Sequence, residues 1–219
     1  MVILSPSMLS ADFKELSKEI QKIEENGAKY LHFDVMDGIF VPNISFGMPV
    51  LKSIRSATNL VCDVHLMITE PIRYVEEFAK AGADIITVHL EACKDVDATI
   101  AKIKECGCKV GVSIKPKTPV SALEPYFEKI DMILIMSVEP GFGGQKFIPA
   151  ALNKLAETKA MLDAKGLQVE LQVDGGITVQ NIEEVIKAGA NIIVAGSSVF
   201  KGDIETNMKD FMEIVNRYE

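Results

Sequence analysis

Four short glycine motifs recur along this 219-residue chain, and each is followed at once by a run of apolar, mostly β-branched residues. The motifs are Asn26-Gly-Ala-Lys, Ala81-Gly-Ala-Asp, Cys106-Gly-Cys-Lys and Ala188-Gly-Ala-Asn. Glycine readily adopts the left-handed conformation that follows a helix, so each motif indicates a helix end that leads into a strand. The apolar runs are too short to be buried helices. The chain is therefore predicted to repeat a helix–strand unit.

The predicted strands alternate with amphipathic stretches. The apolar runs are Val2–Leu4, Tyr30–Val35, Leu60–Leu66, Ile85–Val88, Val110–Ile114, Met132–Ser137, Gln168–Val173 and Ile192–Ala195. Helical spacing of apolar residues is found in Asp12–Glu25, Pro71–Lys80, Asp97–Glu105, Ala150–Ala164, Val179–Lys187 and Glu205–Arg217. Such alternation gives either an open doubly wound sheet or a closed barrel of parallel strands.

Two observations favour the closed barrel. Eight strand–helix units within 219 residues match the size of an eightfold barrel. After the first strand the chain reads Ser5-Pro-Ser-Met-Leu-Ser-Ala, without the Gly-x-Gly-x-x-Gly turn of a nucleotide-binding sheet. We therefore expect an α/β fold with a single (β/α)8 TIM-barrel domain over residues 1–219.

Composition excludes several classes of partner. With 23 basic and 31 acidic residues the formal charge is −8, and no basic block of the kind that binds nucleic acid is present. The start of the chain, Met1-Val-Ile-Leu-Ser-Pro, lacks the features of a signal peptide, and no segment reaches membrane-spanning length. The four cysteines form no disulfide framework or zinc motif. We expect a cytoplasmic protein with reduced thiols and no nucleic-acid or membrane partner.

Several ionisable side chains lie within the predicted apolar strands, where burial of an unpaired polar group costs the most free energy. His32 and Asp34 lie two residues apart, so they point to the same face of their strand, and His65 and Asp174 end two other strands. An unpaired polar group there costs several kcal/mol, which favours a shared function. Because the chemistry of such barrels gathers at the carboxyl ends of the strands, these four residues form a candidate metal site.

This ligand set leaves some questions open. Two imidazoles and two carboxylates suit Zn²⁺, Fe²⁺, Mn²⁺ or Co²⁺, and the sequence does not choose among them. Asp63 is expected to orient a neighbouring side chain rather than to bind metal. His89 is either a core residue or a partner of a metal ligand, satisfied by Glu91 or by a backbone carbonyl.

Three glycine-rich turns follow the last three strands. They are Pro140-Gly-Phe-Gly-Gly-Gln145, Asp174-Gly-Gly-Ile177 and Ala195-Gly-Ser-Ser198. Glycine allows backbone N–H groups to approach a phosphate closely, and helix N-termini, expected after the last two turns, favour an anion. Barrels commonly bind phosphate in this region, so an anionic substrate is predicted.

The chain closely resembles the ribulose-phosphate 3-epimerase family. The resemblance runs from end to end, through Pro6-Ser-Met-Leu-Ser-Ala-Asp12, His32-Phe-Asp-Val-Met-Asp-Gly38, Val41-Pro-Asn43, Asp63-Val-His-Leu-Met67, Val138-Glu-Pro-Gly-Phe-Gly-Gly-Gln145, Val173-Asp-Gly-Gly-Ile177 and Ala195-Gly-Ser197. It implies a homo-oligomeric, metal-dependent enzyme of the pentose phosphate pathway. Such an enzyme interconverts D-ribulose 5-phosphate and D-xylulose 5-phosphate.

The resemblance also implies roles for individual residues. Asp34 and Asp174 match the acid/base pair, and together with His32 and His65 they match the ligands of one divalent metal ion per subunit, for which we expect Zn²⁺ or Fe²⁺ before Mn²⁺ or Co²⁺. The residues that match substrate contacts are Ser7, Met36, His65, Met67, Met136, Gly141, Phe142, Gly143, Gly144, Gly175, Gly176, Gly196 and Ser197. Independently of the resemblance, composition and position make Phe142 and the segment Asp37–Asn43 candidate lids.

Three alternatives are weighed against this interpretation. A six-carbon substrate would make the protein an allulose-6-phosphate 3-epimerase with the same chemistry. A Schiff-base aldolase would use Lys115, which follows the fifth strand. A non-catalytic phosphosugar-binding barrel would keep the glycines but would not need Asp34 and Asp174 together.

Overall fold

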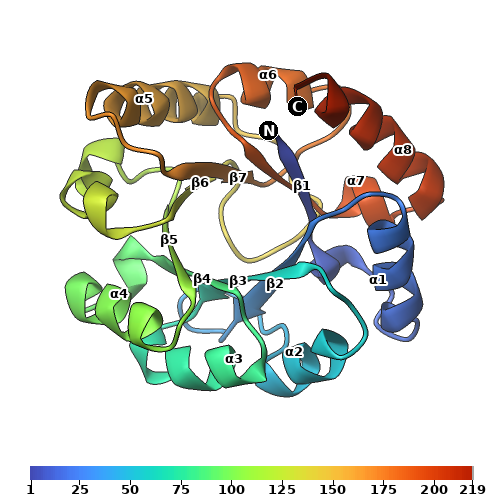
Figure 1. The fold of residues 1–219 in the computed structure, drawn as a ribbon, viewed down its shortest axis with the longest axis horizontal. Helices are drawn as coiled ribbons and strands as arrows, with labels where there is room; N and C mark the ends of the chain where they lie inside the picture. Colours follow the sequence, from blue (N-terminus) through green and yellow to red (C-terminus); the bar gives the residue numbers. More distant parts are fainter. Residues whose placement is uncertain (219) are drawn as a thin grey trace.

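The computed structural model describes residues 1–218 as a barrel of parallel strands surrounded by helices (Figure 1). In this part of the chain the eight strands are β1 (Ile3–Pro6), β2 (Tyr30–Met36), β3 (Val61–Met67), β4 (Ile85–His89), β5 (Lys109–Ile114), β6 (Met132–Met136), β7 (Glu170–Asp174) and β8 (Ile192–Ala195). They are ordered β1-β8-β7-β6-β5-β4-β3-β2. The ends of this order, β1 and β2, meet at a bridge between Ser7 and His32, which nearly closes the barrel. The predicted fold class is confirmed.

The helices lie outside the strands. They are α1 (Leu16–Glu25), α2 (Met48–Arg55), α3 (Val75–Ala81), α4 (Val96–Glu105), α5 (Ala150–Ala164), α6 (Ile182–Lys187), α7 (Ser197–Phe200) and α8 (Ile204–Val215). Short 3-10 segments are η1 (Met8–Ser10), η2 (Pro71–Arg73), η3 (Leu90–Ala92), η4 (Val120–Lys129) and η5 (Asn216–Tyr218). The structure thus adds α2, α7, η4 and the short segments η1 and η3 to the helices expected from sequence. Pro125 lies inside η4, where it prevents a regular α-helical hydrogen bond.

The glycine motifs have the predicted role. Gly27, Gly82, Gly107 and Gly189 have φ angles of +96°, +111°, +79° and +114°, and they follow α1, α3, α4 and α6. A side chain in this left-handed region would be strained, so glycine ends each helix and turns the chain into β2, β4, β5 or β8.

Alternation along the strands separates two environments. On β2, Leu31 and Phe33 are fully buried among the helices, where Ile20 and Ile23 of α1 belong to the same apolar cluster. The other face points into the barrel, whose amino end is filled by Tyr30, Ile85, Met132 and Ile192. Buried polar side chains such as Asp34 and His65 lie further along the strands, toward the carboxyl end of the barrel interior.

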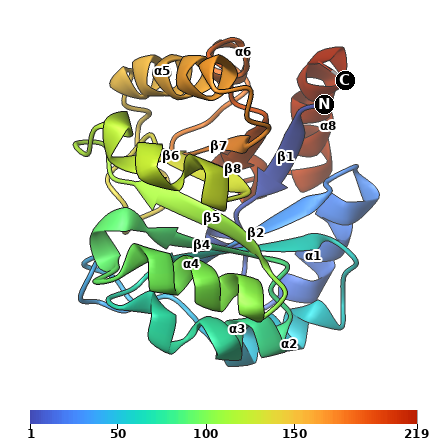
Figure 2. The ribbon, with the colours of Figure 1, turned by 60° about the vertical axis from the view of Figure 1, so that its left-hand side comes forward.

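The chain closes on itself around the barrel. Helix α8 packs against α1 and β1, and both views show the two termini side by side (Figures 1 and 2). None of the helices within residues 1–218 has the length and apolar character needed to cross a membrane. All four cysteines, which lie in the described region, are free thiols, as expected.

Candidate active site and metal centre

Strands β2, β3 and β7 bring four ionisable side chains to one point at the carboxyl end of the barrel. The parallel register pairs Asp34 of β2 with His65 of β3, while His32 precedes Asp34 on the same face of β2. Asp174 ends β7. One possible ligand atom from each of these residues lies within 4.8 Å of every other. The predicted four-residue cluster is therefore assembled by the fold.

The distances within the cluster suit a metal ion. His32 Nε2 lies 3.3 Å from His65 Nδ1 and 3.4 Å from Asp34 Oδ1, and His65 Nδ1 lies 3.3 Å from Asp34 Oδ1. Asp174 Oδ2 lies 3.9 Å and 3.8 Å from the same two nitrogens. A tetrahedral site with bonds of about 2.0–2.1 Å separates its ligands by about 3.4 Å. The buried His/Asp cluster can thus hold a divalent ion.

Asp63 orients one of the two imidazoles, as the sequence indicated. Its Oδ2 lies 2.7 Å from His32 Nδ1 and also accepts hydrogen bonds from Gln172 Nε2 at 2.5 Å and Ser5 Oγ at 3.4 Å. With Nδ1 engaged, His32 presents Nε2 to the cluster. Burial lowers the pKa of His32, but the charges of Asp63 and Asp34 outweigh it and hold that pKa well above its usual value.

His89 contacts the other imidazole. The Nε2 atoms of His65 and His89 are 2.9 Å apart, and the two rings are stacked. On its far side His89 Nδ1 lies 3.4 Å from Glu91 Oε2. Burial is the main cause that lowers the pKa of His89 to about 4. Of the two partners considered from sequence, the carboxylate of Glu91 lies beside His89 Nδ1 but makes no hydrogen bond of standard geometry with it.

The two carboxylates have different environments. Asp34 Oδ2 accepts a 2.6 Å hydrogen bond from Ser7 Oγ. Burial would raise the pKa of Asp34, but His32 and His65 outweigh it and hold that pKa far below its usual value. Burial and the charge of Asp34 raise the pKa of Asp174 to about 6. A bound cation would oppose this rise, because it favours the ionised form of both groups.

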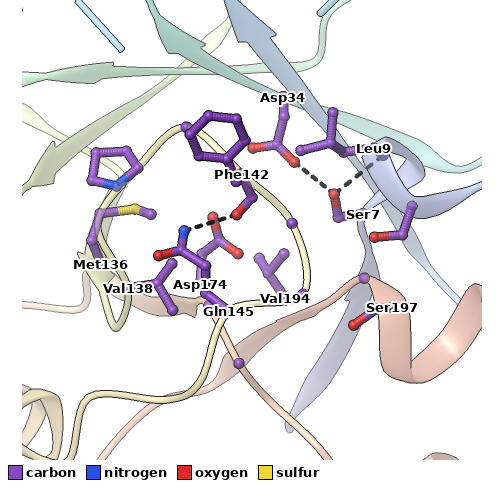
Figure 3. A pocket seen from close by; sticks show the side chains of 18 of the residues that line it. Ser7, Leu9, Asp34, Met136, Val138, Phe142, Gln145, Asp174, Val194 and Ser197 are labelled. Atoms are coloured by element: carbon purple, nitrogen blue, oxygen red, sulfur yellow. Dashed lines mark hydrogen bonds between the residues drawn. The ribbon is translucent and has the colours of Figure 1, made fainter. Parts of the chain in front are cut away.

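A cavity opens above the cluster, with Asp34, Asp174 and Met136 on its walls (Figure 3). The residues expected there from sequence that line it are Ser7, Asp34, Met36, Met67, Met136, Gly141, Phe142, Gly143, Gly144, Asp174, Gly175, Gly176, Gly196 and Ser197. His32 and His65 are fully buried and lie outside this lining. His65 therefore belongs to the candidate metal site and not to the lining of the cavity.

Sequence reasoning missed part of the lining. The additional residues are Leu9, Ser10, Val138, Pro140, Gln145, Ile177 and Val194. Most of them are apolar or belong to loops, so they carry no chemical signal of their own. Pro140 and Gln145 flank a glycine-rich turn that was singled out, and only their position in that motif pointed to them.

The glycine-rich turns are tightly packed around the cavity. Gly176 has a φ of +67°, and a Cβ there would lie 2.8 Å from Phe147 Cα. A Cβ on Gly196 would lie 2.8 Å from Ser10 Oγ. Gly196 directly precedes α7, as predicted, whereas residues 177–181 separate Gly176 from α6. Only the turn after β8 therefore leads straight into a helix.

Two loops meet over the cavity. Asn43 Nδ2 donates a 2.8 Å hydrogen bond to the carbonyl of Gly141, which joins the segment after β2 to the turn after β6. Gln145 Nε2 donates to the carbonyl of Phe142 at 2.9 Å (Figure 3) and to that of Glu139 at 2.7 Å, which folds that turn on itself. The Phe142 side chain stays 54 % exposed at the rim.

Lys115 does not occupy the site. Its ammonium group lies 3.9 Å from the centre of the Phe40 ring, as in a cation–π contact, and Lys115 is outside the cavity lining. A Schiff-base lysine has to reach the substrate carbonyl from the cavity wall. The aldolase alternative is therefore not favoured.

Comparisons with known proteins show the family to which this chain belongs. The sequence model of the Ribulose-phosphate 3 epimerase family matches residues 3–200. The chain is 51 % identical over 201 residues to a ribulose-phosphate 3-epimerase of Bacillus subtilis, covering 91 % of this chain and 93 % of the relative. It is 49 % identical over 199 residues to the Escherichia coli K12 protein of the same name, covering 90 % and 88 %.

A solved structure shares the fold alone. The 3-keto-L-gulonate-6-phosphate decarboxylase of Vibrio cholerae superposes with a TM-score of 0.72 at 15 % identity, covering all of this chain and 98 % of that one.

The match to the family model over most of the chain, and identities near 50 %, decide the assignment. This chain belongs to the ribulose-phosphate 3-epimerase family.

Proposed function

We propose that this enzyme interconverts D-ribulose 5-phosphate and D-xylulose 5-phosphate by moving a proton at C3. The observation that carries the proposal is the pair of carboxylates, Asp34 and Asp174, that share one cluster and one cavity. Inversion of a carbon next to a ketone needs proton removal on one face and proton return on the other. One carboxylate on each side of the sugar supplies both steps.

Each carboxylate divides its oxygens between two tasks. Asp34 Oδ1 and Asp174 Oδ2 face the imidazole nitrogens. Asp34 Oδ2 and Asp174 Oδ1 are then the atoms that exchange protons with the substrate. In one direction an ionised carboxylate takes the C3 proton, the C–H electron pair forms the C2=C3 double bond, and the π pair of the C2 carbonyl moves to its oxygen to give a cis-enediolate. The other, protonated carboxyl returns a proton to the opposite face, and the roles reverse in the back reaction.

We propose His32, Asp34, His65 and Asp174 as the ligands of one divalent cation per subunit. Such a cation, when bound, supplies Lewis-acid stabilisation of the negative charge that develops on substrate oxygens. Zn²⁺ and Fe²⁺ suit the mixed nitrogen and oxygen ligands best, and Mn²⁺ and Co²⁺ are also compatible. Metal analysis of the purified protein identifies the ion.

The remaining wall residues are assigned to substrate binding. Met36, Met67 and Met136 are at least 96 % buried at the cavity. Their weakly polar thioethers would exclude water from the enediolate without donating a proton. Gly141, Phe142, Gly143 and Gly144 would cover the sugar. Gly175, Gly176, Gly196 and Ser197 would bind the phosphate through backbone N–H groups, and Ser7 would position both Asp34 and the substrate.

Incubation with ribulose 5-phosphate in D₂O tests the proposal. The expected result is xylulose 5-phosphate with deuterium at C3. Products of carbon–carbon cleavage, or an absence of exchange at C3, would overturn it. Relative turnover of allulose 6-phosphate tests the six-carbon alternative, and we expect the pentose phosphate to be preferred. A homo-oligomeric state and a cytoplasmic location stay predictions, to be checked by light scattering and cell fractionation.

A further inference from the structure

Three side chains, His65, His89 and Glu91, form a row that leads from the candidate metal site away from the substrate cavity. His65 Nε2 lies 2.9 Å from His89 Nε2, and His89 Nδ1 lies 3.4 Å from Glu91 Oε2. Among the residues described, none of these three lines the cavity. These three side chains therefore do not contact a substrate in the cavity directly.

The positions of the protons along this row of side chains follow from the contacts that His65 makes in the candidate metal site. His65 presents Nδ1 to the other candidate ligands, and a nitrogen that binds a cation carries no proton. The proton of His65 then lies on Nε2 and is donated to His89 Nε2. His89 must accept with Nε2, so its own proton lies on Nδ1 and points toward Glu91.

Glu91 is held in the orientation that this arrangement requires. Its Oε1 accepts hydrogen bonds from the backbone N–H of Lys115, at 2.8 Å, and from the Thr118 hydroxyl. Its Oε2 is left to face His89 Nδ1, a buried atom with no hydrogen bond of standard geometry in the described part of the chain. Glu91 is thus the carboxylate that ends this row of side chains.

We infer that Glu91 is a positioning residue for the cation, acting through His89 to fix the tautomer and orientation of His65 and so to set metal affinity. The inference deepens the proposed function and rests on it. The carboxylate of Asp63 contacts His32 directly. The carboxylate of Glu91 contacts His89, and only the imidazole of His89 contacts His65. Loss of such outer partners typically weakens metal binding 10–100-fold.

Titration of the metal-free protein with Zn²⁺, in competition with a chromophoric chelator, tests the inference with the Glu91→Gln variant. The glutamine amide can turn its N–H₂ toward His89, which would move the His89 proton to Nε2, against the proton of His65. We expect Zn²⁺ binding about 10–100-fold weaker than in the wild type and an altered visible spectrum of bound Co²⁺. Glu128→Gln, which removes an equal charge from an exposed position, should change neither.

A second variant, His89→Phe, separates action through His89 from a simple charge effect. If Glu91 acts through His89, Glu91→Gln should cause less than about a twofold further loss when His89 is already phenylalanine, because coupled residues are not additive. An undiminished loss in that background, or Zn²⁺ binding by Glu91→Gln equal to the wild type, would overturn the inference while leaving the proposed function standing.

Two further measurements keep the test decisive. Thermal unfolding of the metal-free proteins shows whether each variant is folded. If Glu91→Gln does not fold, Thr118→Val removes one hydrogen bond that anchors Glu91 and should weaken Zn²⁺ binding in the same direction by a smaller factor; unchanged binding would then count against the inference. Failure of the wild type itself to bind Zn²⁺ or Co²⁺ would overturn both this inference and the proposed metal site.

Discussion

One carboxylate oxygen of Asp34 lies within 4.8 Å of one carboxylate oxygen of Asp174, although the two residues come from strands that are not neighbours in the barrel. Two like charges at this distance repel each other in a buried site, and burial together with the charge of Asp34 raises the pKa of Asp174. His32 and His65 lie between them and reduce it. A divalent cation at the same point would reduce it further.

Replacing either carboxylate should stop catalysis without unfolding the barrel. Asp34→Asn and Asp174→Asn each remove a proton carrier, and we expect kcat to fall at least 10²–10⁴-fold, the range for general acid–base groups. Circular dichroism should show an unchanged fold. Asp210→Asn, an exposed aspartate on α8, is the matched control and should keep full activity. Near-normal turnover in either site variant would refute the two-base assignment.

Chelation should abolish activity and lower thermal stability together. Because the ion binds the folded protein, saturation at about 100 times Kd adds about 2.7 kcal/mol to the free energy of unfolding. For a chain of this size that corresponds to about 5–10 °C in Tm. Calorimetry with and without chelator, followed by Zn²⁺ or Fe²⁺ replacement, measures both effects. Full activity in a demonstrably metal-free sample would contradict the metal requirement.

Removing the charge of Asp63 should weaken metal binding through His32. In Asp63→Asn the imidazole loses the carboxylate that accepts at Nδ1, 2.7 Å away, and becomes a poorer ligand. We expect an approximately 10–100-fold loss of metal affinity, measured by Co²⁺ titration. Excess metal should restore much of the activity, since Asp63 lies outside the cavity lining. Unchanged affinity would show that His32 needs no such partner.

Adding one methyl group at Gly176 should destabilise the turn after β7. Gly166 is the matched control, because its φ of +66° nearly equals the +67° of Gly176 but nothing lies within 4 Å of its Cβ position. Gly166→Ala should cost only the left-handed conformation, about 1–2 kcal/mol. Gly176→Ala should cost an additional 1–3 kcal/mol or so from the collision with Phe147, and should raise KM. Urea unfolding measures the difference; equal losses would show that the turn relaxes.

Replacing Lys115 should leave turnover close to that of the wild type. Lys115→Met removes a cation–π contact with Phe40, worth about 0.5–1 kcal/mol at an accessible site. It removes no group from the cavity. Steady-state kinetics and borohydride trapping check the expectation. Loss of activity together with covalent labelling of the wild-type lysine would revive the aldolase alternative.

Much of the fold was predictable because its signals are local. The glycine of Ala81-Gly-Ala-Asp ends a helix wherever that helix lies, and alternation in Tyr30–Met36 puts His32 and Asp34 on one face in any sheet. Helix α2 escaped prediction because it buries only two side chains, Leu51 and Ile54, whereas the shorter α6 buries three. Segment η4 escaped because Pro125 interrupts the helical pattern.

By itself the sequence determined which residues carry chemistry and which face of each element they occupy, since both depend on neighbours a few positions away. Only the tertiary structure decided which strand ends meet, because barrel closure and strand register set the distances between residues far apart in the chain. Register pairs Asp34 with His65, and closure brings Asp174 to them. The row of contacts from His65 through His89 to Glu91 arises in the same way.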